Sequence, residues 1–336
     1  MNKTKKNVYT LIIFIITCIA MILIAGFRPV GIDNDSYAYE SALNAFFNNE
    51  YEIKEPAFIL FSELTEVLFN KDVTALFLMY AISAITLKSY CIYRYADLPL
   101  MSLMIYIGMY FILHDMTQIR VGVAAAFFLL AIPDLITGSN KRYVIKISLA
   151  IFFHYSAFLL LPLIFLKNKK ISIYFYFLLP FITLASVILI GDMHPILIKL
   201  FSFFPAPLGP KAVNYIINLE LYGRFDNINI FSKSTLFVLS IFMLYTIVML
   251  KMEHKEHNHI IFYKIMSLML TLFYLCSSVP VLASRAFELL GVSMIFSLPA
   301  LCLKIHQKKI MLSMLTIWVV AYFCVVCLKL LDFSLV

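Results

Sequence analysis

Apolar runs long enough to cross a membrane follow one another along almost the whole chain. Apolar and aromatic residues make up 62% of the 336 residues, whereas charged residues make up only 14%. A soluble chain would carry roughly a quarter charged residues, and about 20 consecutive apolar residues suffice to cross a bilayer. The pattern therefore predicts an all-α polytopic membrane protein with a single integral membrane domain over residues 1–336.

Most of the apolar runs predict uninterrupted spans, and two segments are irregular. Uninterrupted spans are expected at residues 8–26, 73–93, 98–114, 119–137, 171–191, 234–251, 260–280, 286–303 and 310–331. The segment 55–70 carries polar residues at helical spacing, and a Phe-His-Tyr-Ser sequence around His154 interrupts the segment 142–166. We expect about 10–11 transmembrane helices, with re-entrant or half-helices that line a cavity at the outer face.

The basic residues choose between two membrane topologies. In the favoured topology the N-terminus is cytoplasmic, 55–70 lies at the outer face, and 142–166 enters the bilayer and returns as two half-helices. Most of the 27 basic residues, Lys88 among them, then lie on the inner side, as the positive-inside rule requires. Residues 27–54 and 192–233 form outer loops, and the short turn 114–120, with Asp115, lies on the same outer side. The alternative lets both irregular segments cross once, which moves Arg120 to the cytoplasm.

Two arginines lie beside long apolar runs, and the favoured topology places both at the outer face. Arg120 precedes a series of small residues, which allow a neighbouring helix to approach closely. Arg285 has Glu288 one turn later, so a salt bridge between them is its simpler role. Arginine stays protonated and its fork suits phosphate oxygens, so the pair predicts an anion site. Anchoring to lipid headgroups is the alternative for Arg120.

Candidate proton acceptors and sugar ligands lie on the same face. Asp33 follows the first span, and Tyr37 shares its side of a helix that begins there; capping that helix is the alternative role of Asp33. His154 can act as a base or donate a hydrogen bond to a phosphate, or be an ordinary core histidine. The loop 192–233 adds Tyr222 and Arg224.

No motif supports a bound cofactor. The chain contains no GxxxxGK[ST] and no HExxH pattern, so nucleotide hydrolysis and zinc chemistry have no sequence support. His254, His257 and His259 have a spacing that could suit a metal, but a solvated cytoplasmic loop is the simpler interpretation. We expect no metal and no cofactor. The net charge of +8 is spread over short loops and does not indicate a nucleic-acid partner.

Short motifs follow one another between residues 8 and 303. They are Gly31-Ile32-Asp33 with Tyr37, Glu55-Pro56, Arg120-Val121-Gly122-Val123-Ala124, His154-Tyr155-Ser156-Ala157 and Arg285-Ala286-Phe287. Their order and spacing resemble the EpsG-like branch of the Wzy polymerases, which extend bacterial O-antigen and exopolysaccharide. The resemblance implies a GT-C-like glycosyltransferase that polymerises undecaprenyl-pyrophosphate-linked oligosaccharide repeat units at the periplasmic face of the inner membrane.

The implied reaction joins two lipid-linked units. A hydroxyl of one unit attacks the anomeric carbon of the growing chain, and undecaprenyl pyrophosphate leaves. The bilayer, a chain-length regulator and a flippase are the further partners that the resemblance suggests. A related polyprenyl-phosphate-dependent glycosyltransferase or an O-antigen ligase is the alternative function, and a lipid-linked glycan flippase or transporter is the alternative class.

The implied reaction gives each candidate residue a role. Asp33 is the expected base, and His154 is the expected hydrogen-bond donor to the leaving phosphate. The expected pyrophosphate ligands are Arg120, Arg224 and Arg285. The residues expected to bind sugar or support the others are Tyr37, Glu55 and Tyr222. Arginines can stabilise the charge of a departing pyrophosphate in place of a metal.

Overall fold

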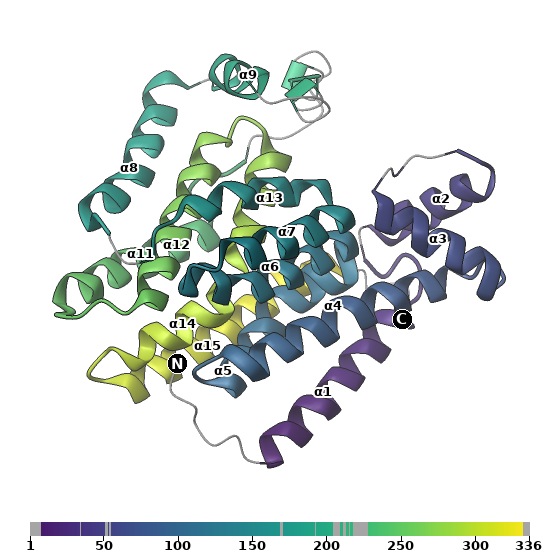
Figure 1. The fold of residues 1–336 in the computed structure, drawn as a ribbon, viewed down its shortest axis with the longest axis horizontal. Helices are drawn as coiled ribbons and strands as arrows, with labels where there is room; N and C mark the ends of the chain where they lie inside the picture. The colour runs from purple at the N-terminus through teal and green to yellow at the C-terminus, as the bar shows by residue number, and fades with distance from the viewer. Residues whose placement is uncertain are drawn as a thin grey trace. The chain divides into compact units, whose positions relative to one another are not determined.

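The computed structural model describes residues 8–33, 35–50, 53, 55–168, 171–191, 193–203, 209–210, 213–214, 216–217 and 228–331. Within these residues the chain is helical, and Asp33 and Leu331 form an isolated β-bridge. The packing divides the chain into two compact units, residues 1–166 with 292–336 (unit 1) and residues 167–291 (unit 2), which are described separately below (Figure 1). The predicted all-α polytopic class is confirmed, whereas the single domain stays a prediction.

Eight helices of the described chain are long and apolar enough to cross a membrane. They are α1 (Val8–Gly26), α4 (Val73–Tyr95), α5 with η1 (Pro99–Tyr106 and Ile107–Thr117), α6 (Ile119–Thr137), α8 (Ile173–Ile190), α11 (Lys233–Lys251), α12 (His257–Leu275), and α15 with η3 (Lys308–Val325 and Cys327–Leu330). A broken pair, α13 (Pro280–Gly291) and α14 (Met294–Leu303), adds a ninth if it counts as one span. This number is below the predicted 10–11, because the irregular segments form helices too short to cross.

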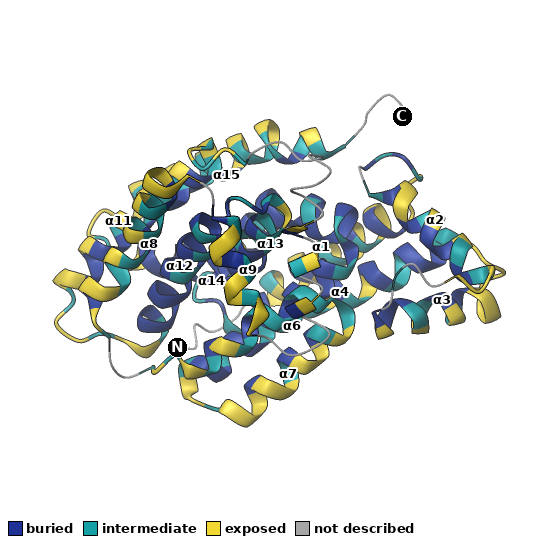
Figure 2. Cartoon of the chain, turned by 90° about the horizontal axis from the view of Figure 1, so that it is seen from above, coloured by how far each residue is buried: buried dark blue, intermediate teal, exposed yellow. Residues whose placement is uncertain are grey.

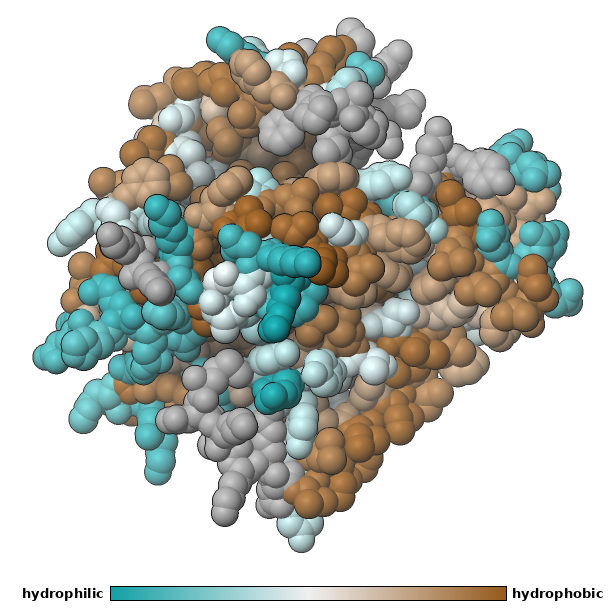
Figure 3. Space-filling view, viewed as in Figure 1, coloured by the Kyte–Doolittle hydropathy of each residue, from teal (hydrophilic) through white to brown (hydrophobic). Residues whose placement is uncertain are grey.

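The helices of unit 1 differ sharply in how many of their residues are buried. In an apolar stretch of 18 residues, 72% of the residues are buried in the α5–η1 segment and in α6, whereas 17% are buried in α1 and in α15 with η3. Exposed residues run along α15 in Figure 2, and apolar side chains cover the outer side of α1 in Figure 3. An apolar surface of this extent is stable against lipid hydrocarbon and unstable against water. Unit 1 thus has central helices enclosed by helices with faces suited to lipid.

The segment 142–166 reverses direction at His154. It forms α7 (Asn140–Phe153) and the 3₁₀ helix η2 (Tyr155–Phe165). The Tyr143 hydroxyl donates a hydrogen bond to the Leu160 carbonyl at 2.6 Å, although a straight helix would separate these residues by about 25 Å. The two half-helices predicted to meet near His154 are therefore present, and a single straight crossing does not form.

The segment 55–70 also agrees with the favoured topology. It forms α3 (Pro56–Leu68), which has 13 residues and would extend only about 20 Å, less than the roughly 30 Å of a hydrocarbon core. Within the predicted outer loop 27–54, the chain forms α2 (Ser36–Phe47), and within 192–233 it forms α9 (His194–Ser202). The side of the membrane on which these helices lie stays a prediction.

Aromatic packing brings the beginnings of several helices together in unit 1. Residues of α2, α3, α4 and α6 share one buried cluster, which includes Tyr39 and Tyr80. Phe153, the last residue of α7, places its ring 5.9 Å from Phe61, 6.4 Å from Tyr80 and 5.7 Å from Phe127, measured between ring centroids. This core holds the α7–η2 break against α3, α4 and α6.

The segment η1 is a π-helix that continues α5 and ends where α6 begins. A Cβ atom added to Gly122 of α6 would lie 2.1 Å from the carbonyl oxygen of His114 in η1, so only glycine permits this contact. The prediction that the small residues after Arg120 allow close approach is confirmed at Gly122. The end of η1 and the start of α6 are thus held close together at Gly122, and π-helical turns are frequent at functional sites.

Candidate functional site

Glu55 joins two of the predicted site residues. Its Oε2 atom lies 2.8 Å from Nη1 of Arg120, and its Oε1 atom lies 3.0 Å from Nδ1 of His154. The side chains are 8% exposed for Glu55, 21% for Arg120 and 16% for His154. These three residues, called the Glu55 cluster below, come from distant parts of the sequence and remain partly accessible.

Each member of the Glu55 cluster lies where a helix begins or ends. Glu55 precedes α3, whose first residue is Pro56; proline is favoured at this position because its fixed φ angle suits the first turn. Arg120 lies in the first turn of α6. His154 has an extended backbone, with φ −156° and ψ 127°, which ends α7. Changes of backbone direction thus aim the three side chains at one point.

The environment of Glu55 favours its charged form. Burial raises the pKa of this carboxyl, but the hydrogen bond with His154 and the charge of Arg120 outweigh burial and leave the pKa below its usual value. The carboxylate is therefore ionised at neutral pH. The Cζ atom of Arg120 also lies 5.6 Å from the centroid of the Tyr39 ring, a distance at which an arginine and an aromatic ring attract each other.

The carboxylate gives His154 a defined chemical role. An ionised carboxylate beside Nδ1 favours the tautomer that carries its proton on Nδ1, so that Nε2 is the basic nitrogen. A base oriented by an acid in this way is the arrangement found in catalytic triads. Arg120 supplies a fixed positive charge beside it. The Glu55 cluster can therefore accept a proton and hold an anion in the same place.

Asp33 lies in a buried ion pair. Its Oδ2 atom is 2.8 Å from Nε of Arg28, and the two side chains are 0% and 1% exposed. Arg28 also donates to the carbonyls of Ala25, at the end of α1, and Met116, near the end of η1, both at 2.6 Å. The pair thus ties α1 to η1. The role of Asp33 as a base stays a prediction, although its carboxylate has no exposed surface here.

Lys88, Tyr106 and Asp115 form a second buried group, called the Lys88 cluster below. Both Lys88 Nζ and the Tyr106 hydroxyl donate to the Asp115 carboxylate at 2.6 Å, and the lysine and aspartate side chains are 0% exposed. The favoured topology places Lys88 on the inner side and Asp115 on the outer side, and this assignment is wrong because the two side chains touch. The sequence could have indicated this pair, because charged residues inside apolar helices usually pair with one another.

The other predicted ligands are Arg285, Tyr37, Tyr222 and Arg224. Arg285, in unit 2, forms the predicted salt bridge with Glu288, with 3.3 Å between Nη1 and Oε2. Tyr37 is 60% exposed in the first turn of α2. Tyr222 and Arg224 lie outside the described residues. The structure therefore brings Glu55, Arg120 and His154 together, and it leaves the roles of the other candidates as predictions.

The histidines of the predicted inner loop do not share one environment. His259 is buried in α12 and its Nδ1 lies 2.7 Å from the Tyr245 hydroxyl. A fully solvated loop is therefore the wrong expectation for His259, because α12 begins at His257 and carries it into the packed interior of unit 2. Among the described residues no group of three His, Cys, Asp or Glu side chains could hold a metal ion.

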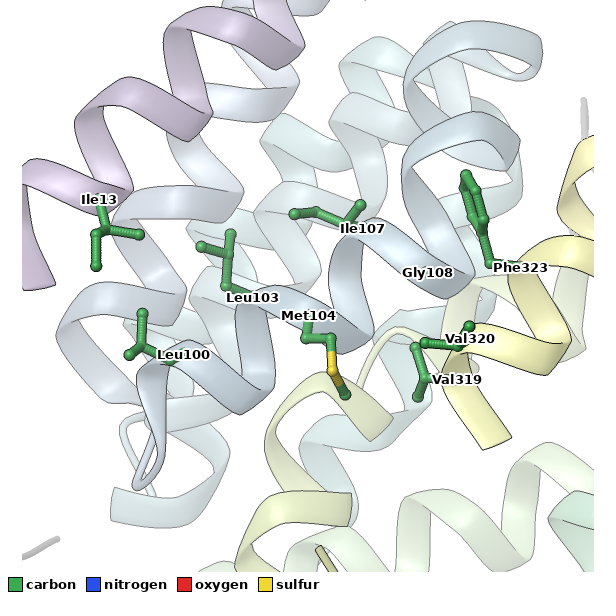
Figure 4. Close-up of a pocket in the computed structure, with 9 residues that line it drawn as sticks. All are labelled: Ile13, Leu100, Leu103, Met104, Ile107, Gly108, Val319, Val320 and Phe323. Atoms are coloured by element: carbon green, nitrogen blue, oxygen red, sulfur yellow. The ribbon is translucent and has the colours of Figure 1, made fainter. Parts of the chain in front are cut away.

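An apolar groove of about 370 Å³ lies between α1, α5, η1 and α15 of unit 1. Figure 4 shows its lining, which is Ile13, Leu100, Leu103, Met104, Ile107, Gly108, Val319, Val320 and Phe323. No lining side chain can donate or accept a hydrogen bond through nitrogen or oxygen. The groove suits a hydrocarbon chain and does not suit a sugar or a phosphate.

Nearly the whole chain matches the model of a protein family. A model of the EpsG family matches residues 11–335. The match includes all the motifs noted in the sequence and every member of the Glu55 cluster. No curated protein and no solved structure shows a significant match to the chain.

Proposed function

The chain belongs to the EpsG family of polysaccharide-polymerase-like membrane proteins, and we propose that it is a Wzy-type O-antigen polymerase. It joins undecaprenyl-pyrophosphate-linked oligosaccharide repeat units into O-antigen or a related surface polysaccharide. The reaction takes place at the periplasmic face of the bacterial inner membrane, with the N-terminus in the cytoplasm. The Glu55 cluster is the observation that supports this proposal, because one carboxylate holds an arginine and a histidine in place.

In the proposed reaction His154 is the base. The acceptor hydroxyl gives its proton to Nε2 of His154 as its oxygen attacks the anomeric carbon of the donor. The bond from that carbon to the pyrophosphate oxygen breaks, and undecaprenyl pyrophosphate leaves with the bonding electrons. Glu55 holds the ring and stabilises the imidazolium that forms. General-base assistance of this kind is typically worth about 10²–10⁴ in rate.

Arg120 stabilises the leaving group in this proposal. A departing pyrophosphate carries several negative charges, and a guanidinium can donate to two of its oxygens at once. The contact with Glu55 uses Nη1 of Arg120, and a guanidinium carries five N–H donors, so it has more N–H groups than this contact needs. Arg285 and Arg224 remain proposed pyrophosphate ligands, with Tyr37 and Tyr222 as proposed sugar ligands.

The proposal assigns the base to His154 rather than Asp33. The Asp33 carboxylate is 0% exposed and its charge is balanced by Arg28, so a sugar would have to open the core to reach it. The ring of His154 is partly exposed and lies beside Glu55 and Arg120. A proton acceptor has to lie within hydrogen-bond reach of the attacking hydroxyl, and His154 meets this requirement with less rearrangement.

The direct test is polymerisation by the purified full-length protein. The substrate is the lipid-linked repeat unit extracted from cells that lack the gene, and the product is resolved by size. We expect a ladder of polymers from the wild type and a rate about 10²–10⁴ lower from His154→Ala. Glu66→Gln is the matched control, since Glu66 forms only an exposed pair with Lys71.

Each other outcome contradicts a stated part of the proposal. An unchanged ladder from His154→Ala would remove His154 as the base. Transfer of a single completed chain to a different acceptor, with no ladder, would identify a ligase instead. Movement of the lipid-linked unit across vesicle membranes without any new glycosidic bond would identify a flippase.

A further inference from the structure

Two polar side chains that are close in sequence to members of the Glu55 cluster have no hydrogen-bond partner for their oxygen atoms within the described chain. They are the Oε1 atom of Gln118 and the Oγ atom of Ser156, and both atoms are buried. Gln118 links η1 to α6, and Ser156 lies in the first turn of η2. Each therefore lies two residues from a member of the Glu55 cluster, Gln118 from Arg120 and Ser156 from His154.

The backbone of Gln118 is already hydrogen-bonded. The Gln118 N–H donates to the Leu113 carbonyl, and the Gln118 carbonyl accepts from Gly122 N–H, both at 2.8 Å. The side-chain oxygen of Gln118 is thus not needed to complete the end of η1 or the start of α6. An unpaired buried oxygen destabilises a protein, and such atoms are expected where the chain serves a ligand rather than its own fold.

The two residues also differ from other unpaired polar groups of the same core. Gln118 and Ser156 are each partly exposed as residues, so rotation about side-chain bonds can present the oxygen to a ligand. Thr117, whose hydroxyl is also unpaired, is only 4% exposed. Thr117 is therefore a suitable comparison, because its hydroxyl is also unpaired but a ligand cannot reach it.

Neutral amide and hydroxyl oxygens suit sugar hydroxyl groups, because they form hydrogen bonds without attracting or repelling charge. We propose that Gln118 and Ser156 recognise the two sugars that react, Gln118 the donor sugar attached to the pyrophosphate and Ser156 the acceptor sugar. This inference rests on the proposed function, in which Arg120 binds the pyrophosphate and His154 faces the acceptor hydroxyl. The sugar that each residue meets follows from its neighbour in the chain.

The test separates donor from acceptor in the purified full-length protein. The lipid-linked repeat unit is the donor, and the oligosaccharide released from it by mild acid is the acceptor. Ser156→Ala should raise the acceptor KM by about 3- to 10-fold, the size of one neutral hydrogen bond, and leave the donor KM unchanged. Gln118→Leu should raise the donor KM by a similar factor. It should not change inhibition by undecaprenyl pyrophosphate, which carries no sugar.

Thr117→Val is the matched control and should change neither KM. An equal effect on both substrates from either variant, no effect at all, or the same effect from Thr117→Val would overturn the inference. Gln118→Leu and Ser156→Ala should unfold at or above the thermal midpoint of the wild type, since neither removes a hydrogen bond within the protein and each removes an unpaired buried oxygen. A clear fall in that midpoint would show that the oxygen is used by the fold, which also overturns it.

A binding measurement distinguishes failure of this inference from failure of the proposed function. If the wild type makes no polymer, the free oligosaccharide should still raise the thermal midpoint of the wild type and should do so less for Ser156→Ala. Absence of that difference would overturn the acceptor site independently of any catalysis.

Discussion

The Glu55 cluster and the Lys88 cluster both place a carboxylate between two donors, yet they differ in access. In the Lys88 cluster the charged side chains are 0% exposed and the two donors approach the Asp115 oxygens at 2.6 Å. In the Glu55 cluster the contacts are 2.8 and 3.0 Å, and the partners of the carboxylate are 16–21% exposed. The first arrangement is closed to solvent, whereas the second leaves a histidine and an arginine partly exposed.

The difference teaches how to separate structural charges from functional ones in this chain. A charge inside an apolar bundle is costly unless a partner neutralises it, whatever its role. Pairing alone is therefore no sign of catalysis. Partial exposure is the feature that distinguishes the two clusters, and the Arg28–Asp33 pair, with side chains 1% and 0% exposed, resembles the closed one. The role of Asp33 as a base stays a prediction.

The largest expected effect comes from breaking the closed cluster. Lys88→Met leaves the Asp115 carboxylate buried without a counter-charge, which should cost about 3–5 kcal/mol of unfolding free energy. Thermal unfolding in detergent, followed by size-exclusion chromatography, measures the loss. Adding Asp115→Leu to the same chain removes the stranded charge and should restore most of the stability. Wild-type stability in the single variant would show that the carboxylate finds another partner or a proton.

Asp33→Asn should have the next largest effect. It removes the charge that balances Arg28, and losing a buried hydrogen bond to a charged group costs about 1.5–3 kcal/mol. The decisive measurement is the polymerisation rate per folded molecule, which should stay near that of the wild type. A stable Asp33→Asn protein with no turnover would return the base to Asp33.

Arg120→Lys tests the open cluster. The substitution keeps a positive charge beside Glu55 but loses the planar fork, so binding of undecaprenyl pyrophosphate should weaken about 10-fold. The unfolding free energy should change by less than about 1 kcal/mol, because partly exposed pairs contribute little. Inhibition constants for undecaprenyl pyrophosphate measure the first effect. An equal inhibition constant for both proteins would reduce Arg120 to a lipid anchor.

The smallest expected effect is the pH dependence of stability due to Glu55. Because its pKa is lowered on folding, the contribution of Glu55 is complete above its pKa in the unfolded chain and is lost as the pH falls through the folded value. Glu55→Gln lacks this contribution, so the difference in unfolding free energy between the two proteins should shrink in acid. A difference that stays constant down to pH 3 would contradict the lowered pKa.

The sequence by itself determined most of the spans and the break at His154. The predicted spans 8–26 and 119–137 have the bounds of α1 and α6, because length and apolar composition are local properties that the bilayer thickness selects. The boundary between the predicted spans 260–280 and 286–303 is wrong, since α12 ends at Leu275 and α13 begins at Pro280. Proline is favoured in the first turn of a helix, and apolar composition alone does not reveal where that helix begins.

The tertiary structure alone decided which charges meet. Glu55 was expected only to bind sugar or support other residues, yet its carboxylate contacts both Arg120 and His154. Asp33 forms a buried ion pair with Arg28. Lys88 and Asp115 form a pair that the predicted sidedness separates. A buried charge needs a partner because burying it alone is costly. Which partner it finds depends on how helices from distant parts of the sequence pack. That packing depends on close contacts such as that of Gly122 with His114.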